Sequence, residues 1–358
     1  MKTMYKILFI LFLIPLTITA TEKKGKYTKS KTIKKEFKVT NDATLNVTNK
    51  YGNIVIATWN ENKIIIDITI TTNGNDEEKV EKRLEQIDVE FNSTTNYVSA
   101  KTMIEKNSRS WNIWGKNNNV NMQIDYVIKM PITNNIDLSN DYGSISLDKL
   151  EGTSKINCDY GKINIGELLN TSNLIKIDYT NKSTIDFMKD GEINADYSTL
   201  HVEKAGRTKL NADYSHISFG MLVDLNYNCD YGDLKIDDCG NLTGNSDYMH
   251  TTVDILRGSG DFDTDYGSIK INELGKDFKN LKIKSSYTSL KFGVNPNTSF
   301  NITAFLNYGG LKYDSGFTFN KEITKSSSKQ YEGYYNSSNS RNTITIKSSY
   351  GNVTFINN

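Results

Sequence analysis

A short motif, Asp-Tyr-Gly followed by alternating apolar residues, recurs along this chain and strongly restricts what it can fold into. The distances between successive marker tyrosines are 18, 19, 18, 17, 17, 17, 18, 21 and 21 residues. These markers are Tyr142, Tyr160, Tyr179, Tyr197, Tyr214, Tyr231, Tyr248, Tyr266, Tyr287 and Tyr308, and Tyr51 and Tyr350 carry the same motif outside the series. A fixed short period is the signature of a repeat architecture, because a unit of this size cannot bury its own apolar face.

Each repeat follows the same register around its tyrosine. Apolar residues stand four places before it and three and five places after it, as with Leu138, Ile145 and Leu147 around Tyr142. A period of two indicates strands, in which every second side chain shares a face. We expect the tyrosine to face the core with the residues two and four places before it. The alternation breaks after the tyrosine, where glycine is frequent, so we expect a glycine corner there.

The register predicts an all-β fold, a parallel β-helix or β-solenoid with rungs of about 17–21 residues and a small α+β capping module at its N-terminal end. An antiparallel β-sandwich is the alternative. It would explain the alternation but not why equivalent positions keep equivalent chemistry over ten copies.

The chain divides into four segments. Residues 1–20 form a secretory signal peptide, because Lys2 and Lys6 precede an apolar run that ends in small residues. We therefore expect an exported protein in the periplasm, at the cell surface or outside the cell, with no membrane span in the mature chain. Residues 21–40 are a polar segment, and residues 41–134 are the α+β module with the first rung. Residues 135–358 are the β-solenoid repeats.

Three segments depart from the repeat. Residues 75–91 predict a helix with Asp76 at its start, because charged residues alternate with a partial apolar stripe. Residues 326–342 are rich in Ser, Asn, Tyr and Gly and predict a surface loop before a last rung at Tyr350. Trp111 and Trp114 mark another exposed excursion.

The sequence predicts no catalytic residue and no cofactor. It lacks a serine nucleophile elbow, a zinc-protease helix, a P-loop and a dinucleotide-binding glycine motif. The three histidines, His201, His216 and His250, fall at outward strand positions. The odd number of cysteines argues against a disulfide framework, so we expect the cysteines to be unpaired and buried; they are Cys158, Cys229 and Cys239. With 43 Lys and Arg against 42 Asp and Glu, the charge gives no reason to expect nucleic acid as a partner.

The residue before the tyrosine is aspartate in eight consecutive repeats: Asp141, Asp159, Asp178, Asp196, Asp213, Asp230, Asp247 and Asp265. In a parallel stack, like charges about 4.8 Å apart repel each other, so something must relieve this column. One interpretation is local, in which each carboxylate accepts backbone N–H bonds at the corner. The other is a calcium site along Asp159, Asp178, Asp196, Asp213 and Asp230.

The chain resembles the bacterial "putative adhesin" family, a domain of unknown function related to auto-transporter-like adhesin repeats. The resemblance rests on "NKYGNIVIATW" at residues 49–59, the acidic helix, "IDYVIKMP" at residues 124–131, and serial "DYGSISL"-type rungs up to the C-terminal residues. It covers residues 40–358. The persistent Asp-Tyr departs from the plain Asn-Gly or Ser-Gly corners of many members. The resemblance implies a β-solenoid with a binding role at the cell surface or envelope, and it transfers no binding residues.

These observations predict an exported, non-enzymatic interaction protein that presents columns of side chains to a glycan or a protein. Two alternatives stay open: a polysaccharide-acting β-helix enzyme, and a periplasmic accessory protein of envelope stress or signalling. The sequence leaves the oligomeric state open.

Overall fold

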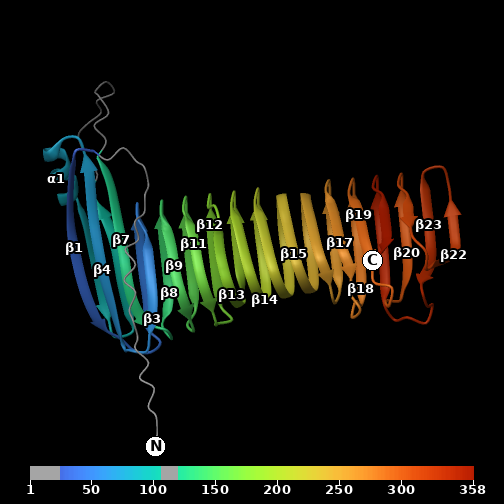
Figure 1. Cartoon of the computed structure of the whole chain (residues 1–358), viewed down its shortest axis with the longest axis horizontal. Helices are drawn as coiled ribbons and strands as arrows, with labels where there is room; N and C mark the ends of the chain where they lie inside the picture. Colours follow the sequence, from blue (N-terminus) through green and yellow to red (C-terminus); the bar gives the residue numbers. More distant parts are fainter. Residues whose placement is uncertain (1–24, 106–119) are drawn as a thin grey trace, which may run out of the picture.

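The computed structural model describes residues 25–105 and 120–358. The predicted signal peptide and the excursion around Trp111 and Trp114 lie outside these residues. Strands make up 72% of the structure and helix 3%, which confirms the all-β prediction. The strands stand side by side along the long axis of the molecule, with helix α1 (Glu77–Glu85) at one end (Figure 1).

The segment before each tyrosine forms the first of two parallel strand arrays. Neighbouring strands pair in matched register, so that Ile156 lies between Leu138 and Ile175. In spatial order the array comprises β2 (Thr44–Lys50), β8 (Asn135–Asp141), β10 (Ser154–Asp159), β12 (Asn173–Asp178), β13 (Ser183–Asp196), β14 (Thr199–Asp213), β15 (His216–Leu256), β16 (Gly260–Asp265), β18 (Asn280–Ser286), β24 (Thr343–Ser349) and β20 (Phe300–Asn307).

The segment after each tyrosine forms the second parallel array. Besides parts of β13, β14 and β15, it comprises β3 (Ile54–Trp59), β9 (Ser144–Leu150), β11 (Lys162–Leu168), β17 (Ser268–Leu274), β19 (Ser289–Val294), β25 (Val353–Asn357) and β21 (Leu311–Tyr313). The antiparallel sandwich is thereby excluded for the repeats. Apolar side chains of both arrays form one hydrophobic core, to which each repeat contributes its expected positions, such as Ile193, Leu200 and Val202.

The corner between the two arrays is formed by the tyrosine itself, not by the glycine after it. All twelve marker tyrosines have a positive φ, between 49° and 61°, whereas the only glycine with a positive φ among the described residues is Gly316. The left-handed conformation interrupts the alternation by one residue. It turns the tyrosine ring outward and places the next residue inward, as with the buried Ser198 and Ser215. The expectation of inward-facing rings was therefore wrong.

Antiparallel strands and one helix cover the N-terminal end of the stack. β4 (Lys63–Gly74) pairs with β1 (Tyr27–Lys38) and with β7 (Asn121–Pro131), and β5 (Ile87–Thr94) pairs with β6 (Tyr97–Ile104). Helix α1 is shorter than expected, because Ile87 already begins β5, but Asp76 caps it by accepting a hydrogen bond of 3.3 Å from the Lys79 amide. Among the described residues, no helix has the length and apolarity needed to cross a membrane.

The C-terminal end differs from the prediction in two ways. Residues 328–335, which fall in the expected surface loop, form β23 (Ser328–Tyr335), and this strand pairs antiparallel with both β20 and β22 (Phe317–Thr324). In addition, β24 lies between β18 and β20, so the repeat of Tyr350 stands inside the stack and not at its end.

Candidate functional site

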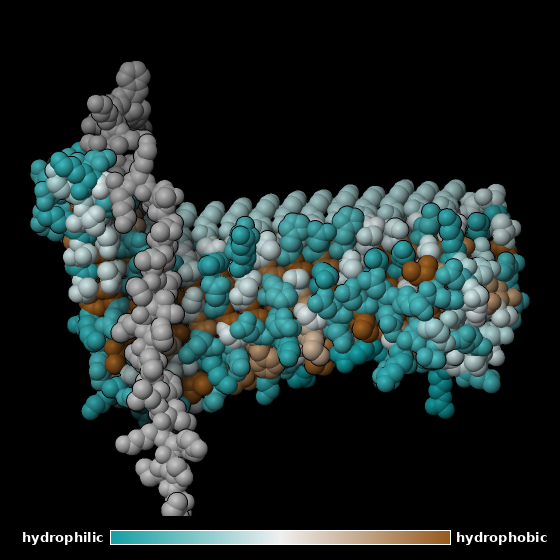
Figure 2. Space-filling view, viewed as in Figure 1, coloured by the Kyte–Doolittle hydropathy of each residue, from teal (hydrophilic) through white to brown (hydrophobic). Residues whose placement is uncertain are grey.

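The marker tyrosines form one continuous stack of rings, which we call the tyrosine column. Its spatial order is Tyr51, Tyr142, Tyr160, Tyr179, Tyr197, Tyr214, Tyr231, Tyr248, Tyr266, Tyr287, Tyr350 and Tyr308. Adjacent ring centroids are 4.7–5.2 Å apart, and adjacent ring planes differ by 1–9°. Each tyrosine is 38–64% exposed. Figure 2 shows a regular row of pale side chains along one long edge of the molecule, which is the arrangement expected of the tyrosine column.

At every tyrosine of the column, an unfavourable backbone conformation is set against favourable ring stacking. The left-handed conformation costs a residue with a Cβ atom about 1–2 kcal/mol, and glycine or asparagine adopts it more cheaply. A stacked aromatic pair returns about 0.5–1.5 kcal/mol. The backbone N–H groups of most of these tyrosines are paired as well, because they donate to a carbonyl of the neighbouring repeat, for example Tyr214 to Asp230 at 2.9 Å. The ring stack therefore offsets a corner conformation that does not itself favour tyrosine.

The stacking decides which part of each ring a partner can reach. Each face of an internal ring is partly covered by a neighbouring ring, so the ring edges and the hydroxyl groups are the parts most open to solvent. Burial and the neighbouring tyrosines raise the pKa of Tyr197, and the same causes raise that of Tyr231. These hydroxyls consequently stay protonated at neutral pH and can both donate and accept hydrogen bonds.

The eight aspartates before the tyrosines form a second column beside the first, the aspartate column (Asp141, Asp159, Asp178, Asp196, Asp213, Asp230, Asp247 and Asp265). Part of its repulsion is relieved by backbone N–H groups: Asp213 donates to the Asp196 carboxylate at 3.3 Å, and Asp247 donates to that of Asp230 at 2.9 Å. Lysine ammonium groups relieve a further part of the repulsion: the Lys50 Nζ lies 2.7 Å from the Asp141 carboxylate, and the Lys176 Nζ lies 3.2 Å from the Asp178 carboxylate.

The relief of the aspartate column is incomplete. Burial, followed by the neighbouring carboxylates of Asp178 and Asp141, raises the pKa of Asp159. One oxygen each of Asp159 and Asp178 is buried without a hydrogen-bond partner among the described residues. Within residues 25–105 and 120–358, no group of three or more His, Cys, Asp or Glu side chains is placed to hold a metal ion. The calcium interpretation thus gains no support from this geometry, while the local interpretation agrees with the hydrogen bonds.

The cysteines and histidines lie where the sequence placed them. All three cysteines are free and buried, and burial raises the pKa of each thiol to about 12. The prediction of unpaired cysteines is confirmed. The histidines are exposed, and His216 contacts Asp233 at 2.7 Å while His250 contacts Ser268 at 2.9 Å.

Sequence reasoning missed a groove of about 960 Å³ at the other corner of the repeats, where the chain returns from the second array to the first. Its signal is present in the spacing. The three consecutive distances of 17 residues, from Tyr197 to Tyr248, mark the shortest repeats, and these repeats supply half of the groove's lining, from Arg207 to Thr243.

Comparisons with known proteins add little. No family model and no curated relative matches the chain. A solved "putative adhesin" from Parabacteroides merdae is 10% identical and aligns over 75% of this chain and 98% of its own, with a TM-score of 0.37. A solved "putative cell adhesion protein" from Clostridium sporogenes is 11% identical and aligns over 92% of this chain and 100% of its own, with a TM-score of 0.18. A solved "putative lipid binding protein" from Parabacteroides distasonis is 12% identical and aligns over 73% of this chain and 96% of its own, with a TM-score of 0.31. At such low scores and identities, these similarities carry no argument about what this chain binds.

Proposed function

We propose that this chain is an exported, non-enzymatic interaction protein, a β-solenoid that presents its tyrosine column to a protein partner at the cell surface or in the envelope. The observation that carries the proposal is the unbroken stack of twelve half-exposed tyrosines along the molecule. Export rests on the predicted signal peptide at residues 1–20, and the solenoid rests on parallel pairing at intervals of 17–21 residues.

The column is large enough for a stable interface. With about 100 Å² exposed on each half-buried ring, twelve rings offer about 1,200 Å². A standard protein interface buries about 800 Å² on each partner, and tyrosine is enriched in such interfaces. Tyrosine combines a rigid apolar body with a polar hydroxyl, which suits it to a surface that is exposed alone and buried in a complex.

The stacking favours a protein over a glycan at this column. A sugar packs its C–H groups against the open face of an aromatic ring, and here neighbouring rings cover part of each face of the internal rings. Ring edges and hydroxyls remain, and these fit the backbone and side chains of a protein surface. Because the aspartate column runs beside the rings, the partner should carry Lys or Arg at the matching rim.

Site-specific photocrosslinking in the producing cell tests the proposal. The photoreactive residue p-benzoylphenylalanine replaces Tyr214, which keeps an aromatic ring in the stack. Illumination should yield a protease-sensitive adduct outside the cytoplasm, because Tyr214 lies at the proposed interface. The control position is Tyr97, which is 40% exposed in β6 and lies off the column. It should give no such adduct.

A second variant separates binding from folding. Asparagine tolerates the left-handed conformation, so Tyr197→Asn and Tyr231→Asn remove two rings while the corners keep their shape. Together they should strongly reduce the adduct at position 214. An adduct with a second copy of this chain would identify the partner as the protein itself. Equal yields at positions 214 and 97, or adducts with glycan or lipid alone, would contradict the proposal.

A further inference from the structure

The groove arises because four consecutive repeats have a shortened corner. Counted from the last core residue of the second strand to the residue four places before the next tyrosine, the chain takes seven positions between Leu168 and Ile175 but only five between Met188 and Ile193. The same five-residue step recurs from Ala205 to Leu210 and in the next two repeats. The longer turn at residues 169–172 therefore projects beyond the corners that follow it, and the recess between them is the groove.

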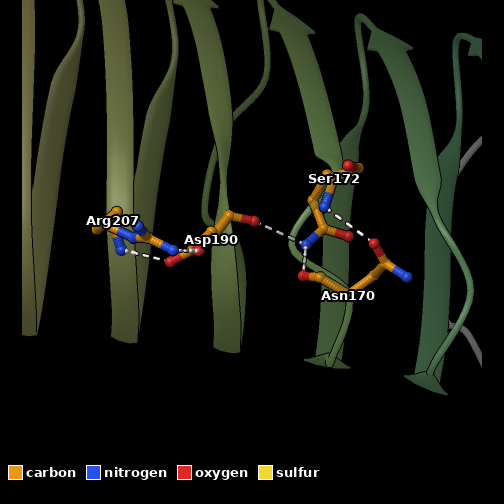
Figure 3. A network of polar contacts seen from close by, with 5 residues as sticks. Asn170, Ser172, Asp190 and Arg207 are labelled. Atoms are coloured by element: carbon orange, nitrogen blue, oxygen red, sulfur yellow. Dashed lines mark hydrogen bonds and ion pairs between the residues drawn. The ribbon is translucent and has the colours of Figure 1, made fainter.

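Polar side chains of neighbouring repeats line this recess, and they form ion pairs and hydrogen bonds from one repeat to the next. The Arg207 guanidinium lies 2.7 Å from the Asp190 carboxylate, and the Arg207 backbone N–H donates to the same group at 2.8 Å. Figure 3 shows this pair continuing into the projecting turn, where Asn173 donates to the carbonyls of Asp190 and Asn170. These contacts hold the lining side chains in place before any ligand arrives.

The charge of the lining is nearly balanced. Its carboxylates are Asp190, Glu192 and Asp224, and its cations are Arg207 and Lys209, which leaves one net negative charge. Each carboxylate already has a donor: Lys209 lies 3.3 Å from Glu192, and Asn241 donates to Asp224 at 2.7 Å. A single net charge is too small to attract a polycation strongly and does not favour a polyanion, while the lining offers many hydrogen-bond donors and acceptors.

A second, more apolar hollow of about 380 Å³ adjoins the groove across the Asp190–Arg207 pair. Phe187, Ala205 and Val223 contribute to it, and Val223 is 57% exposed. In addition, Thr208 lines the groove, and its Oγ1 atom is buried with no hydrogen-bond partner among the described residues. A ligand with a dense set of hydroxyl groups and a less polar C–H surface matches this combination.

A peptide fits the groove less well. An extended peptide adds to a sheet through an open strand edge, and here the corner residues Asp190–Glu192 and Arg207–Lys209 are already paired in register with their neighbours. A helical peptide needs a row of large apolar side chains in the groove, whereas only Leu174 and Leu225 among the lining residues are of that type. The recess spans the repeats from Ser154 to Thr243, five steps of about 4.8 Å, or roughly 24 Å.

We propose that this corner groove binds a neutral oligosaccharide, laid along the stack across the short repeats. Its hydroxyl groups pair with the fixed carboxylates, amides and guanidinium group, and its C–H face lies toward the hollow at Val223. The site is separate from the tyrosine column, so glycan binding here and protein binding there are independent.

Calorimetric titration of the purified protein with neutral hexasaccharides tests the proposal. The probes are cellohexaose, maltohexaose, chitohexaose and xylohexaose. At least one should bind saturably. Asn226→Trp fills the groove from an exposed lining position without breaking an ion pair and should weaken binding about tenfold or more. The control is Lys282→Trp, which occupies the equivalent place in a repeat outside the groove, five residues before its tyrosine, and should leave binding unchanged.

Three results would overturn the proposal: no binding of any of the four hexasaccharides, binding that Asn226→Trp leaves intact, or a preference for polygalacturonate or heparin over the neutral probes. Tyr197→Asn combined with Tyr231→Asn should not change the affinity for the oligosaccharide. This variant keeps the result distinct from the fate of the tyrosine column, because loss of protein crosslinking with intact sugar binding would affect only one of the two sites.

Discussion

Tyr214 shows how one residue sets both the shape and the surface of a repeat. Its φ of 52° makes the corner, and its ring stacks on Tyr197 and Tyr231 at 4.9 and 4.8 Å. The ring is 50% exposed, so truncating it leaves no core cavity. What the ring contributes to stability is the stacking with its two neighbours.

Replacing Tyr214 by alanine and by glycine separates these effects. Loss of two stacked contacts should lower the free energy of unfolding by about 1–3 kcal/mol in Tyr214→Ala. Tyr214→Gly should be more stable than Tyr214→Ala by about 1 kcal/mol, because glycine adopts a positive φ without strain. Urea denaturation measures both.

Lys270 provides the control, since it is exposed in β17 and has no positive φ. There the order should be reversed, with Lys270→Ala more stable than Lys270→Gly. If Tyr214→Gly were also the less stable of its pair, the corner conformation would not be left-handed in solution.

The alternation of apolar residues was sufficient to locate the core but not the ring. Ile193 and Leu200 are buried as expected, because side-chain period is a direct consequence of strand geometry. A single left-handed residue reverses the faces that follow it, and the break in alternation places that residue at the tyrosine or directly after it without deciding between the two. Glycine was the natural candidate, yet it follows the tyrosine for a different reason. A Cβ atom on Gly161 would lie 1.9 Å from the Gly143 carbonyl oxygen of the neighbouring repeat.

At the scale of the strand, repulsion between neighbouring carboxylates of the aspartate column reduces the stability of the stack of repeats. Burial raises the pKa of Asp213, and the nearby carboxylates of Asp196 and Asp230 raise it further, although a hydrogen bond from the Asp230 amide lowers it. The folded protein therefore holds this proton more tightly than the unfolded chain. Ionised Asp213 reduces stability above its raised pKa, and that reduction is lost as the pH falls through this pKa toward the ordinary value of 3.8.

Asp213→Asn should raise the unfolding midpoint at pH 7 by the equivalent of about 0.5–1 kcal/mol, because it removes two like-charge contacts between adjacent strands. The gain should disappear when both proteins are measured below the ordinary carboxyl pKa. Thermal unfolding monitored by circular dichroism across this pH range gives the comparison.

Asp190 is the matched control. A hydrogen bond from Arg207 lowers its pKa, so its charge stabilises the fold at neutral pH. Asp190→Asn should therefore lower the midpoint at pH 7, opposite to Asp213→Asn. A midpoint for Asp213→Asn at or below that of the parent at neutral pH would mean that the column is already neutralised.

At the scale of the whole molecule, stability is the sum of contacts between adjacent repeats, and the order of those repeats could not be predicted. Each repeat inside the stack pairs only with the repeat on either side of it, as in other repeat proteins. All repeats share one register, so the sequence does not distinguish β20 from β24 as the neighbour of β18. The inserted hairpin of β22 and β23 decides it, because pairing with β23 occupies the outer side of β20.

Ending the chain after Asn342 removes β24 and β25 and should disrupt only one end of the stack. Hydrogen exchange should quicken in β20 and β23, while β8 to β11 keep their protection, because stability is local in a stack of repeats. Adding a peptide of residues 343–357 should restore protection, since its buried side chains include Ile344, Ile346, Val353 and Phe355.

A peptide of the same composition in scrambled order serves as the control and should restore nothing. If β20 kept its protection in the shortened chain, it would have paired directly with β18. The repeats would then be interchangeable at that position.

The position of β24 also affects how the protein is made. The ribosome delivers β20 to β23 before β24, yet β24 must lie inside them, against β18. The stack cannot be finished by adding each repeat as it emerges, and its far end stays unsealed until residues 343–357 arrive. A chain whose translation stops short leaves an unpaired strand edge, the feature that promotes aggregation and exposes a chain to proteases. Pairing of β24 with β18 and with β20 removes that edge.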